Sequence, residues 1–326
     1  MPTMMDVAQR AGVSVATVSY VLNGNKPIST EVVERVQEAM RATGYQPNSV
    51  ARALRTGQSR TLGLVVPDLT NPSFPQFLQA IEARARNDGY ATVLMESSNK
   101  ENEAQNLTFL TQRGVDGLLW MLGSDHLPSI KPSVPTVILD YAPTGWLTVH
   151  PDDYGGGRMQ ARFAKQLGHK NVALLWGPRS LTSMKERRRG FHDESGGDLN
   201  VVLELEASFS LELPKNLERK LEAERGNYTF LACGNDTLAI AAIKTLKTLG
   251  ISVPEDVSVI GFDDTPLSTV IDPPLTTIAQ PVKKLGTFAV ELLLSQLQDK
   301  DILQPNMVIP VSLIQRRSTK PFVSKK

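Results

Sequence analysis

The chain has 326 residues, of which 41% are apolar and 21% are charged, and its net charge is +1. This length predicts two or three domains with room for a large core, and the ordinary composition excludes disordered, collagenous and coiled-coil chains. No run of about 18 apolar residues is present, so no transmembrane helix is expected. A single cysteine and four scattered histidines give no disulfide framework and no metal-ligand spacing, so neither a metal nor a cofactor is expected.

The charge is unevenly distributed along the chain. Residues 1–60 hold seven Lys or Arg and four acids, a net charge of +3, whereas the remaining residues have a net charge of −2. A basic segment ahead of a near-neutral body is typical of a DNA-binding headpiece on a separate sensor, because phosphate neutralisation needs local positive charge. The same excess also falls within ordinary variation, so charge alone only indicates this class.

Two short helices are predicted at the N-terminus. Thr3 begins a capping-box pattern for a helix from about residue 4 to 11, and Gly12 ends it. Ser14 follows a turn of helix-turn-helix length and can cap a second helix over about 15–22. The exposed side chains of that second helix are small, which permits close approach to a major groove.

A third helix is expected from a cap near Ser29 to Gly44, with apolar residues at helical spacing. Together the three helices predict a helix-turn-helix domain. A plain three-helix domain without a ligand has the same pattern, so the next segment has to decide between them.

The segment that follows reads Tyr-Gln-Pro-Asn-Ser-Val-Ala-Arg-Ala-Leu-Arg from Tyr45 to Arg55. Together with Asp-Val-Ala-x-x-Ala-Gly-Val-Ser-x-Ala-Thr-Val-Ser from Asp6 to Ser19, it resembles the headpiece and hinge of the LacI/GalR family of bacterial transcription repressors. The resemblance implies a hinge helix that orders on operator DNA, with Leu54 as an apolar wedge in the minor groove. A helix of about six residues is too short to be stable in water, which agrees with folding on docking. Alternatively, Leu54 packs on the next domain.

One position of the headpiece departs from the family pattern. Many relatives carry an Arg that reads guanine where this chain has Tyr20, and a Tyr cannot make that bidentate contact, so the base preference should differ. Thr and Ser can reach phosphates or base edges, and Ala and Val methyl groups can touch thymine methyl groups. The candidate DNA-binding residues are Thr3, Ser14, Val15, Ala16, Thr17, Ser19, Tyr20, Asn23, Asn48, Val50, Ala51, Arg52, Leu54 and Arg55.

From residue 61 the chain alternates short apolar runs with helical patterns, which predicts parallel βαβ units. In the first series, strands are expected at 62–66, 91–95, 117–122 and 134–139, with helices at about 74–85 and 101–113. In the second series, helices are expected at 154–168, 181–195, 214–225 and 236–249, with strands at 171–176, 201–205, 229–232 and 257–260. A further helix around 285–292 follows, so the chain is expected to cross back to the first half. Two such halves bind small ligands between the carboxyl ends of their strands.

The body also resembles the same family, which is similar to two-lobe periplasmic sugar-binding proteins. The matching stretches run from Val66-Pro-Asp-x-x-Asn-Pro-x-Phe to Pro274-Leu-Thr-Thr-Ile-x-Gln. The resemblance implies a cleft in which carboxylate, amide and guanidinium groups bind vicinal hydroxyls and an aromatic ring covers the apolar side of a sugar. The candidate ligand-binding residues are Asn71, Phe74, Asp140, Ser183, Arg187, Phe209, Asn235, Asp263 and Gln280. As structural alternatives, Asp263 caps a loop, Arg187 lies on a solvated face and Phe74 belongs to a core stripe.

Enzyme signatures are missing from the sequence. It contains no P-loop, dinucleotide-binding, zinc-protease or nucleophile-elbow motif. Residues 155–157 are three glycines that open a helix, where they could bind an anion or relieve crowding beside a lobe crossover. Cys233 lies in an apolar strand and is expected to be packed rather than nucleophilic. We therefore predict no reaction.

The sequence thus predicts an α/β protein with an N-terminal all-α helix-turn-helix headpiece and a two-lobe, periplasmic-binding-protein-like body with parallel sheets. We expect a helix-turn-helix domain at 1–45, a hinge helix and linker at 46–60, and an effector-binding and dimerisation domain at 61–326. The first lobe should comprise about 61–153 and 281–308, and the second lobe about 154–280 and 309–320.

The predicted function is a repressor that binds a palindromic double-stranded operator as a homodimer, because half-sites one helical turn apart require a two-fold dimer. The effector is expected to be a sugar or a related metabolite in the interlobe cleft. One alternative keeps the fold but uses a nucleobase or a phosphorylated metabolite as corepressor, and another is a transport-type sugar-binding protein. The first residues do not form a secretory signal, so we expect a cytoplasmic, nucleoid-associated protein without a membrane partner.

Overall fold

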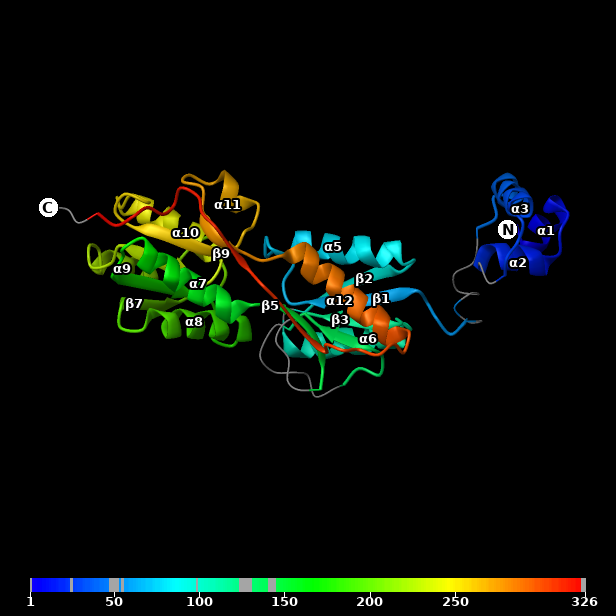
Figure 1. The fold of residues 1–326 in the computed structure, drawn as a ribbon, viewed down its shortest axis with the longest axis horizontal. Coiled ribbons are helices and arrows are strands. Elements are labelled where there is room, and N and C mark those ends of the chain that lie inside the picture. Colours follow the sequence, from blue (N-terminus) through cyan, green and yellow to red (C-terminus); the bar gives the residue numbers. More distant parts are fainter. Residues whose placement is uncertain are drawn as a thin grey trace. The chain divides into compact units, whose positions relative to one another are not determined.

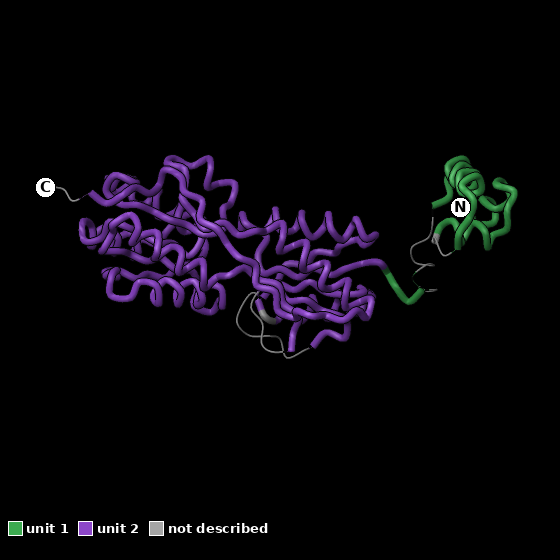
Figure 2. The backbone as a smooth tube through the Cα atoms, viewed as in Figure 1, with its two compact units in different colours: residues 1–59 green, residues 60–326 purple. Residues whose placement is uncertain are grey.

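The structure is a computed structural model that describes residues 2–23, 26–46, 53, 56–97, 99–122, 131–139 and 145–323, except for the side chains of Asn23 and Lys100. The chain divides into two compact units, residues 1–59 and 60–326 (Figure 2). In the described residues the first unit contains helices only, and the second unit is α/β, as the sequence predicts (Figure 1).

The first unit contains the three predicted helices, α1 (Met4–Ala11), α2 (Val15–Asn23) and α3 (Thr30–Thr43). Thr3 caps α1 in the expected capping box, and Gly12 ends that helix with a left-handed φ of 63°. Ser29 is the N-cap residue of α3, but its side chain makes no capping hydrogen bond, which differs from the expected cap. The helices pack through small buried side chains, which are Val7, Ala8, Ala11, Val18, Val36 and Ala39.

The first lobe of the second unit is a parallel sheet of six strands in the order β11-β5-β4-β3-β1-β2. Apolar side chains of α5 and α12 cover one face of this sheet, and those of α6 cover the other. The elements of the lobe are β1 (Thr61–Val66), α5 (Phe74–Asn87), β2 (Ala91–Glu96), α6 (Lys100–Gln112), β3 (Gly117–Trp120), β4 (Thr136–Ile138), β5 (Leu147–Pro151), α12 (Val282–Leu297) and β11 (Asn306–Ile309).

The second lobe has a sheet in the order β12-β10-β9-β8-β6-β7, in which only β12 is antiparallel to its neighbour among the described strands. Helices α7 and α8 cover one face, and α9 and α10 cover the other. The elements are α7 (Asp153–Gln166), β6 (Asn171–Trp176), α8 (Thr182–Ser195), β7 (Asn200–Glu206), α9 (Lys215–Ala223), β8 (Phe230–Cys233), α10 (Asp236–Thr248), β9 (Ser258–Asp263), α11 (Leu267–Val270), β10 (Thr276–Ala279) and β12 (Ser312–Ile314).

The chain crosses between the two sheets three times, at residues 151–153, 279–282 and 309–312, which we call the crossover segments. The predicted return to the first lobe is confirmed, because α12 packs on α5. The sequence did not indicate four strands, β5, β10, β11 and β12. Each has only three to five residues, so the apolar pattern is too short to show a period.

The glycines at the start of α7 allow an unusually close contact with α8. A Cβ on Gly157 would lie within 2 Å of the backbone oxygen of Arg187, and Gly190 of α8 approaches the backbone of Tyr154 in the same way. Ordinary side chains at either position would force the helices apart. Of the two interpretations of this glycine run, the structure therefore supports relief of crowding.

Candidate functional site

In the first unit, α2 presents the candidate DNA-binding side chains. Ser14 caps this helix by accepting a hydrogen bond from the backbone of Thr17 at 3.0 Å. Val18 is buried, whereas Ser14, Val15 and Ala16 are exposed, so the small residues lie on the free face. Thr3 is exposed and also caps α1, so it has a structural task of its own.

Tyr20 lies on α2 beside a cation. The ammonium of Lys26 lies 4.7 Å from the centre of the Tyr20 ring, which is a cation–π geometry. The remaining candidate positions fall outside the described residues: the side chain of Asn23, and Asn48, Val50, Ala51, Arg52, Leu54 and Arg55 in the expected hinge helix.

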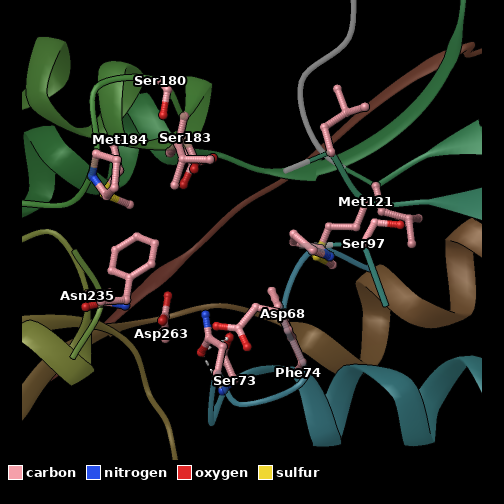
Figure 3. A pocket seen from close by; sticks show the side chains of 18 of the residues that line it. Asp68, Ser73, Phe74, Ser97, Met121, Ser180, Ser183, Met184, Asn235 and Asp263 are labelled. Carbon is pink, nitrogen blue, oxygen red and sulfur yellow. Dashed lines mark hydrogen bonds between the residues drawn. The ribbon is translucent and has the colours of Figure 1, made fainter. Parts of the chain in front are cut away.

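In the second unit, a cavity of about 690 Å³ is lined by both lobes at the carboxyl ends of their strands. Asp68, Ser73, Phe74, Ser97 and Met121 of the first lobe face Ser180, Ser183, Met184, Asn235 and Asp263 of the second lobe (Figure 3). Eight of the nine predicted ligand-binding residues line this cavity, namely Asn71, Phe74, Ser183, Arg187, Phe209, Asn235, Asp263 and Gln280. The ninth, Asp140, lies outside the described residues.

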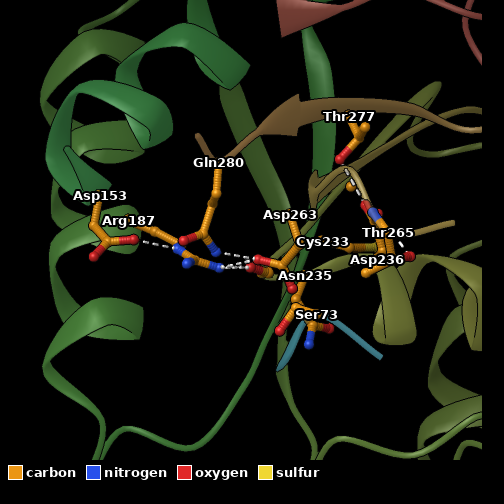
Figure 4. Close-up of polar contacts among 12 residues, drawn as sticks. Ser73, Asp153, Arg187, Cys233, Asn235, Asp236, Asp263, Thr265, Thr277 and Gln280 are labelled. Atoms are coloured by element: carbon orange, nitrogen blue, oxygen red, sulfur yellow. Dashed lines mark hydrogen bonds and ion pairs between the residues drawn. The ribbon is translucent and has the colours of Figure 1, made fainter. Parts of the chain in front are cut away.

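Arg187 is the centre of the polar network under the cavity (Figure 4). Its Nε donates to Asp153 Oδ1 at 2.7 Å, and its Nη1 donates to the backbone oxygen of Gly234 at 2.7 Å and to Asp263 Oδ1 at 3.5 Å. The guanidinium stacks on the ring of Phe262 at 3.5 Å, and the side chain is 5% exposed. This excludes the solvated-face alternative for Arg187. Among the described residues, its Nη2 has no protein acceptor.

Asp263 lies at the end of β9 and joins Arg187 to Gln280, whose Nε2 donates to Asp263 Oδ1 at 2.6 Å. Burial raises the pKa of Asp263 to about 6, because the lost hydration outweighs the nearby guanidinium. Asp263 has a φ of 118° and Asp264 a φ of 60°, a strained backbone of the kind that functional sites retain. Asp264 is held by Arg316 at 2.5 Å, so this turn is fixed on both sides.

A second buried carboxyl lies behind Asp263. Asp236 at the start of α10 accepts hydrogen bonds from the backbone of Thr265 at 2.7 Å and from the hydroxyl of Thr277 at 2.6 Å. Burial and the neighbouring charge of Asp263 raise the pKa of Asp236 to about 7. This residue does not line the cavity; it fixes the loop after β9 against β10.

Phe209 and Asn235 complete the second-lobe wall. The ring of Phe209 lies on Gly177, where a Cβ would come within 2.4 Å of it, so this glycine allows the aromatic side chain to lie flat. Asn235 is 2% exposed, and its side chain caps α10 by accepting from the backbone of Leu238 at 2.9 Å. An aromatic face beside an amide is a surface suited to a polyhydroxyl ring.

The first-lobe wall is built where β1 leads into α5. Asn71 Oδ1 accepts from the backbone and the hydroxyl of Ser73 at 3.0 and 2.9 Å, which fixes the loop in front of the helix. Phe74 begins α5, is half-buried and lines the cavity, whereas the core stripe of that helix begins at Phe77. The core alternative for Phe74 is thereby weakened.

Sequence reasoning missed Asp153, which lines the cavity and pairs with Arg187. Burial raises its pKa, and the charge of Arg187 opposes this shift. A usable signal existed: two acids, Asp152 and Asp153, and then Tyr154 precede three glycines at a helix start. Glu103 was also missed; it lines the cavity, and one of its oxygens accepts from Trp120 Nε1 at 2.7 Å.

Cys233 is fully buried, and burial raises the pKa of its thiol, which agrees with the packed alternative. In the described part of the chain, no helix combines the length and the hydropathy required to cross a bilayer. The described residues likewise contain no group of three or more His, Cys, Asp or Glu side chains that could hold a metal ion.

Two family models match the chain. Residues 3–48 match the bacterial regulatory proteins of the lacI family, and residues 161–319 match a periplasmic binding protein-like domain. The HTH-type transcriptional repressor PurR of Aliivibrio fischeri strain MJ11 is 34% identical over 335 residues, which cover 97% of this chain and 99% of that protein.

Solved structures agree with this assignment. The lac repressor dimer bound to operator and the anti-inducer ONPF has a TM-score of 0.86 at 32% identity, covering 98% of this chain and 99% of that one. A LacI family regulator from Enterococcus faecium with bound ribose has a TM-score of 0.71 at 29% identity, covering 81% and 100%. The chain therefore belongs to the lacI family of bacterial regulatory proteins and is a DNA-binding transcriptional repressor with an effector-binding domain.

Proposed function

We propose that the cavity of the second unit binds an uncharged polyhydroxyl effector of the sugar type, which controls the affinity of the headpiece for its operator. The observation that carries this proposal is the convergence of Arg187, Asp263 and Asn235 beside the ring of Phe209. Guanidinium, carboxylate and amide groups recognise vicinal hydroxyls, and an aromatic face covers the apolar side of the ring. A relative of known structure with bound ribose supports the same class.

The charge of the cavity argues against a phosphorylated effector. Among the described lining residues the carboxylates are Asp68, Glu101, Glu103, Asp153 and Asp263, and the only cation is Arg187. That cation is already shared between two carboxylates and a backbone oxygen. A phosphate would enter a region of negative potential in which only one donor nitrogen of the guanidinium is left, which is unfavourable. Of the two corepressor classes in the alternative, phosphorylated metabolites are therefore disfavoured and uncharged nucleobases remain.

For the DNA side, we assign residues 1–45 to the headpiece, 46–60 to the hinge and linker, and 61–326 to effector binding and dimerisation. Operator recognition belongs to the exposed face of α2 and to Leu54 in the hinge. A homodimer is supported by β2, an edge strand of the first sheet on which Val93 and Leu94 are about 40% exposed. The role is binding without a chemical step, carried out in the cytoplasm, where chromosomal DNA lies.

The effector class is tested by thermal unfolding of the purified protein with three panels of compounds: sugars, sugar phosphates and nucleobases. D-ribose, D-ribose 5-phosphate and adenine are the first members of these panels. A molecule that binds only the folded protein raises its melting temperature. We expect uncharged sugars to give the shift, Arg187→Met to abolish it, and Arg189→Met to keep it, because Arg189 is an exposed arginine of the same helix that pairs with Glu186. Stabilisation by phosphates or nucleobases alone would contradict the proposal.

The DNA side is tested by selecting palindromic duplexes from a random pool and measuring their mobility shift. We expect the parent chain to select two-fold symmetric sites and Leu54→Ala to bind them at least tenfold more weakly. Parent and variant with equal affinity would remove the wedge from the mechanism, and a parent chain that selects no palindrome would contradict the homodimer.

A further inference from the structure

The crossover segments are joined to one another at the base of the effector cavity. The first and third are joined through the backbone, because the N–H of Asp152 donates to the oxygen of Ile309 at 2.9 Å. The first and second are joined through side chains. Asp153 ends the first crossover segment, Gln280 lies in the second, and Arg187 and Asp263 connect them by the bonds described above (Figure 4).

The outer two links of this network are 2.7 and 2.6 Å long, whereas the central one, from Arg187 Nη1 to Asp263 Oδ1, is 3.5 Å. Asp153 and Arg187 have side chains that are 7% and 5% exposed, and Asp263 is 5% exposed. Buried charges of this kind keep their geometry, because separating them would leave an uncompensated charge in a poorly hydrated place. The bond from Gln280 N to the backbone oxygen of Asp263 at 3.3 Å gives the second crossover segment another contact at the same residue.

All four members of this network line the cavity, so a ligand and the crossover segments meet at the same side chains. Arg187 can offer Nη2 to a ligand only while Nε is held by Asp153 and the guanidinium lies on Phe262. Gln280 holds Asp263 in the same manner from the opposite side. Hinge motion between lobes is absorbed by a few residues in such connecting segments.

We propose that Asp153 and Gln280 are positioning residues that orient Arg187 and Asp263 and, through them, hold the first and second crossover segments at a fixed spacing. The network restricts rotation of the lobes in the unliganded protein. A ligand in the cavity changes the hydrogen bonds of Arg187 and Asp263. Because these two residues are bonded to Asp153 and Gln280, the change is transmitted to the first and second crossover segments. The inference deepens the proposed effector control, and it is tested without effector or DNA.

The test measures the distance between the lobes in the full chain by pulsed electron–electron double resonance. Nitroxide labels are placed at Gln79→Cys on α5 and Arg219→Cys on α9, two exposed sites. The native Cys233 is buried and is left unlabelled. We expect a narrow distance distribution in the parent and at least a twofold greater width in Asp153→Ala. Asp153→Asn keeps an acceptor for Arg187 and should give an intermediate width.

Asp152→Asn is the matched control, because it removes the same charge from the same segment at a residue that caps α7 and has no bond to Arg187. Its distribution should equal that of the parent. Gln280→Met removes the bond at the other end of the network and should also broaden the distribution. In the double variant Asp153→Ala/Gln280→Met, the increase in width should be smaller than the sum of the increases in the two single variants. If Asp153→Ala does not fold, the widths of the distance distributions of Asp153→Asn and Gln280→Met test the proposal instead. Parent widths in these variants, or equal broadening in Asp152→Asn, would overturn the proposal.

Discussion

Gly157→Ala should destabilise the second unit more than any other single methyl added to α7. The Cβ of the new residue would meet the backbone oxygen of Arg187, which cannot swing aside as a side chain could. Helices α7 and α8 would have to separate by more than about 1 Å before ordinary van der Waals contact returned. The separation would also loosen the packing of Phe163 and Phe191 beneath them.

The magnitude follows from two opposed effects. Overpacking costs about 1–3 kcal/mol or more, and we take the upper end because the obstacle is backbone. Replacing Gly by Ala inside a helix returns about 1 kcal/mol through helix propensity. The net loss of unfolding free energy is therefore about 2 kcal/mol, which lowers the melting temperature of a domain of this size by about 4–8 °C.

The assay is thermal unfolding followed by circular dichroism, with Gly197→Ala as the matched control. Gly197 has open space around its position and needs no left-handed backbone, so its substitution should leave the melting temperature unchanged or slightly higher. Equal melting temperatures for Gly157→Ala and the parent would refute the reasoning, because the α7–α8 contact would then not need a glycine.

Three further predictions follow from single residues. Asp236 and Asp263 bind protons more tightly in the folded protein than in the unfolded chain, where Asp has a pKa of about 3.9. The stability that these raised pKa values contribute is fully present below about pH 3.9. It is lost as the pH rises through about 6 for Asp263 and about 7 for Asp236. Calorimetry should therefore show that the stability of Asp263→Asn relative to the parent improves from about pH 4 to about pH 7, and a constant difference would contradict the raised pKa. Cys233 should resist an aromatic disulfide reagent in the folded protein and react once per chain after denaturation, since burial blocks both access and ionisation; rapid reaction of the native protein would contradict its burial. Tyr20→Arg should shift the selected half-site toward guanine at one position, because Arg binds guanine in a bidentate manner; unchanged selection would mean that Tyr20 does not face the bases.

Periodicity in the sequence was sufficient to place most of the fold. The helix expected at about 74–85 and the buried strands expected at 62–66 and 171–176 are all present close to their predicted bounds. Strands β5 and β10 were not predicted because their buried positions include Thr148, Thr276 and Thr277. These polar residues are buried without interrupting the sheet. An apolar pattern cannot identify strands whose core positions are threonine.

The family resemblance predicted most of the described candidate residues of the cavity, but it did not predict Asp153. The eight described candidates line one cavity because their motifs fall at the carboxyl ends of strands, which the topology gathers in one place. Asp153 was missed because its importance depends on Arg187, which is 34 residues away in the chain. Pairing of that kind is a tertiary property, and nothing in the local pattern around Asp153 distinguishes it from Asp152.

The run from Lys185 to Arg189 shows why burial of a charge could not be derived from local sequence. Arg187, Arg188 and Arg189 have the same propensity and hydropathy, yet Arg187 is buried over Phe262, Arg188 pairs with Glu204, and Arg189 is 60% exposed. Helix phase separates them, because Arg187 shares its face with Met184, Gly190 and Phe191. That face can approach α7 only where Gly157 and Gly190 lack side chains. The chemistry of the cavity thus depends on two glycines, and substitutions that keep the fold but widen this contact should weaken effector binding first.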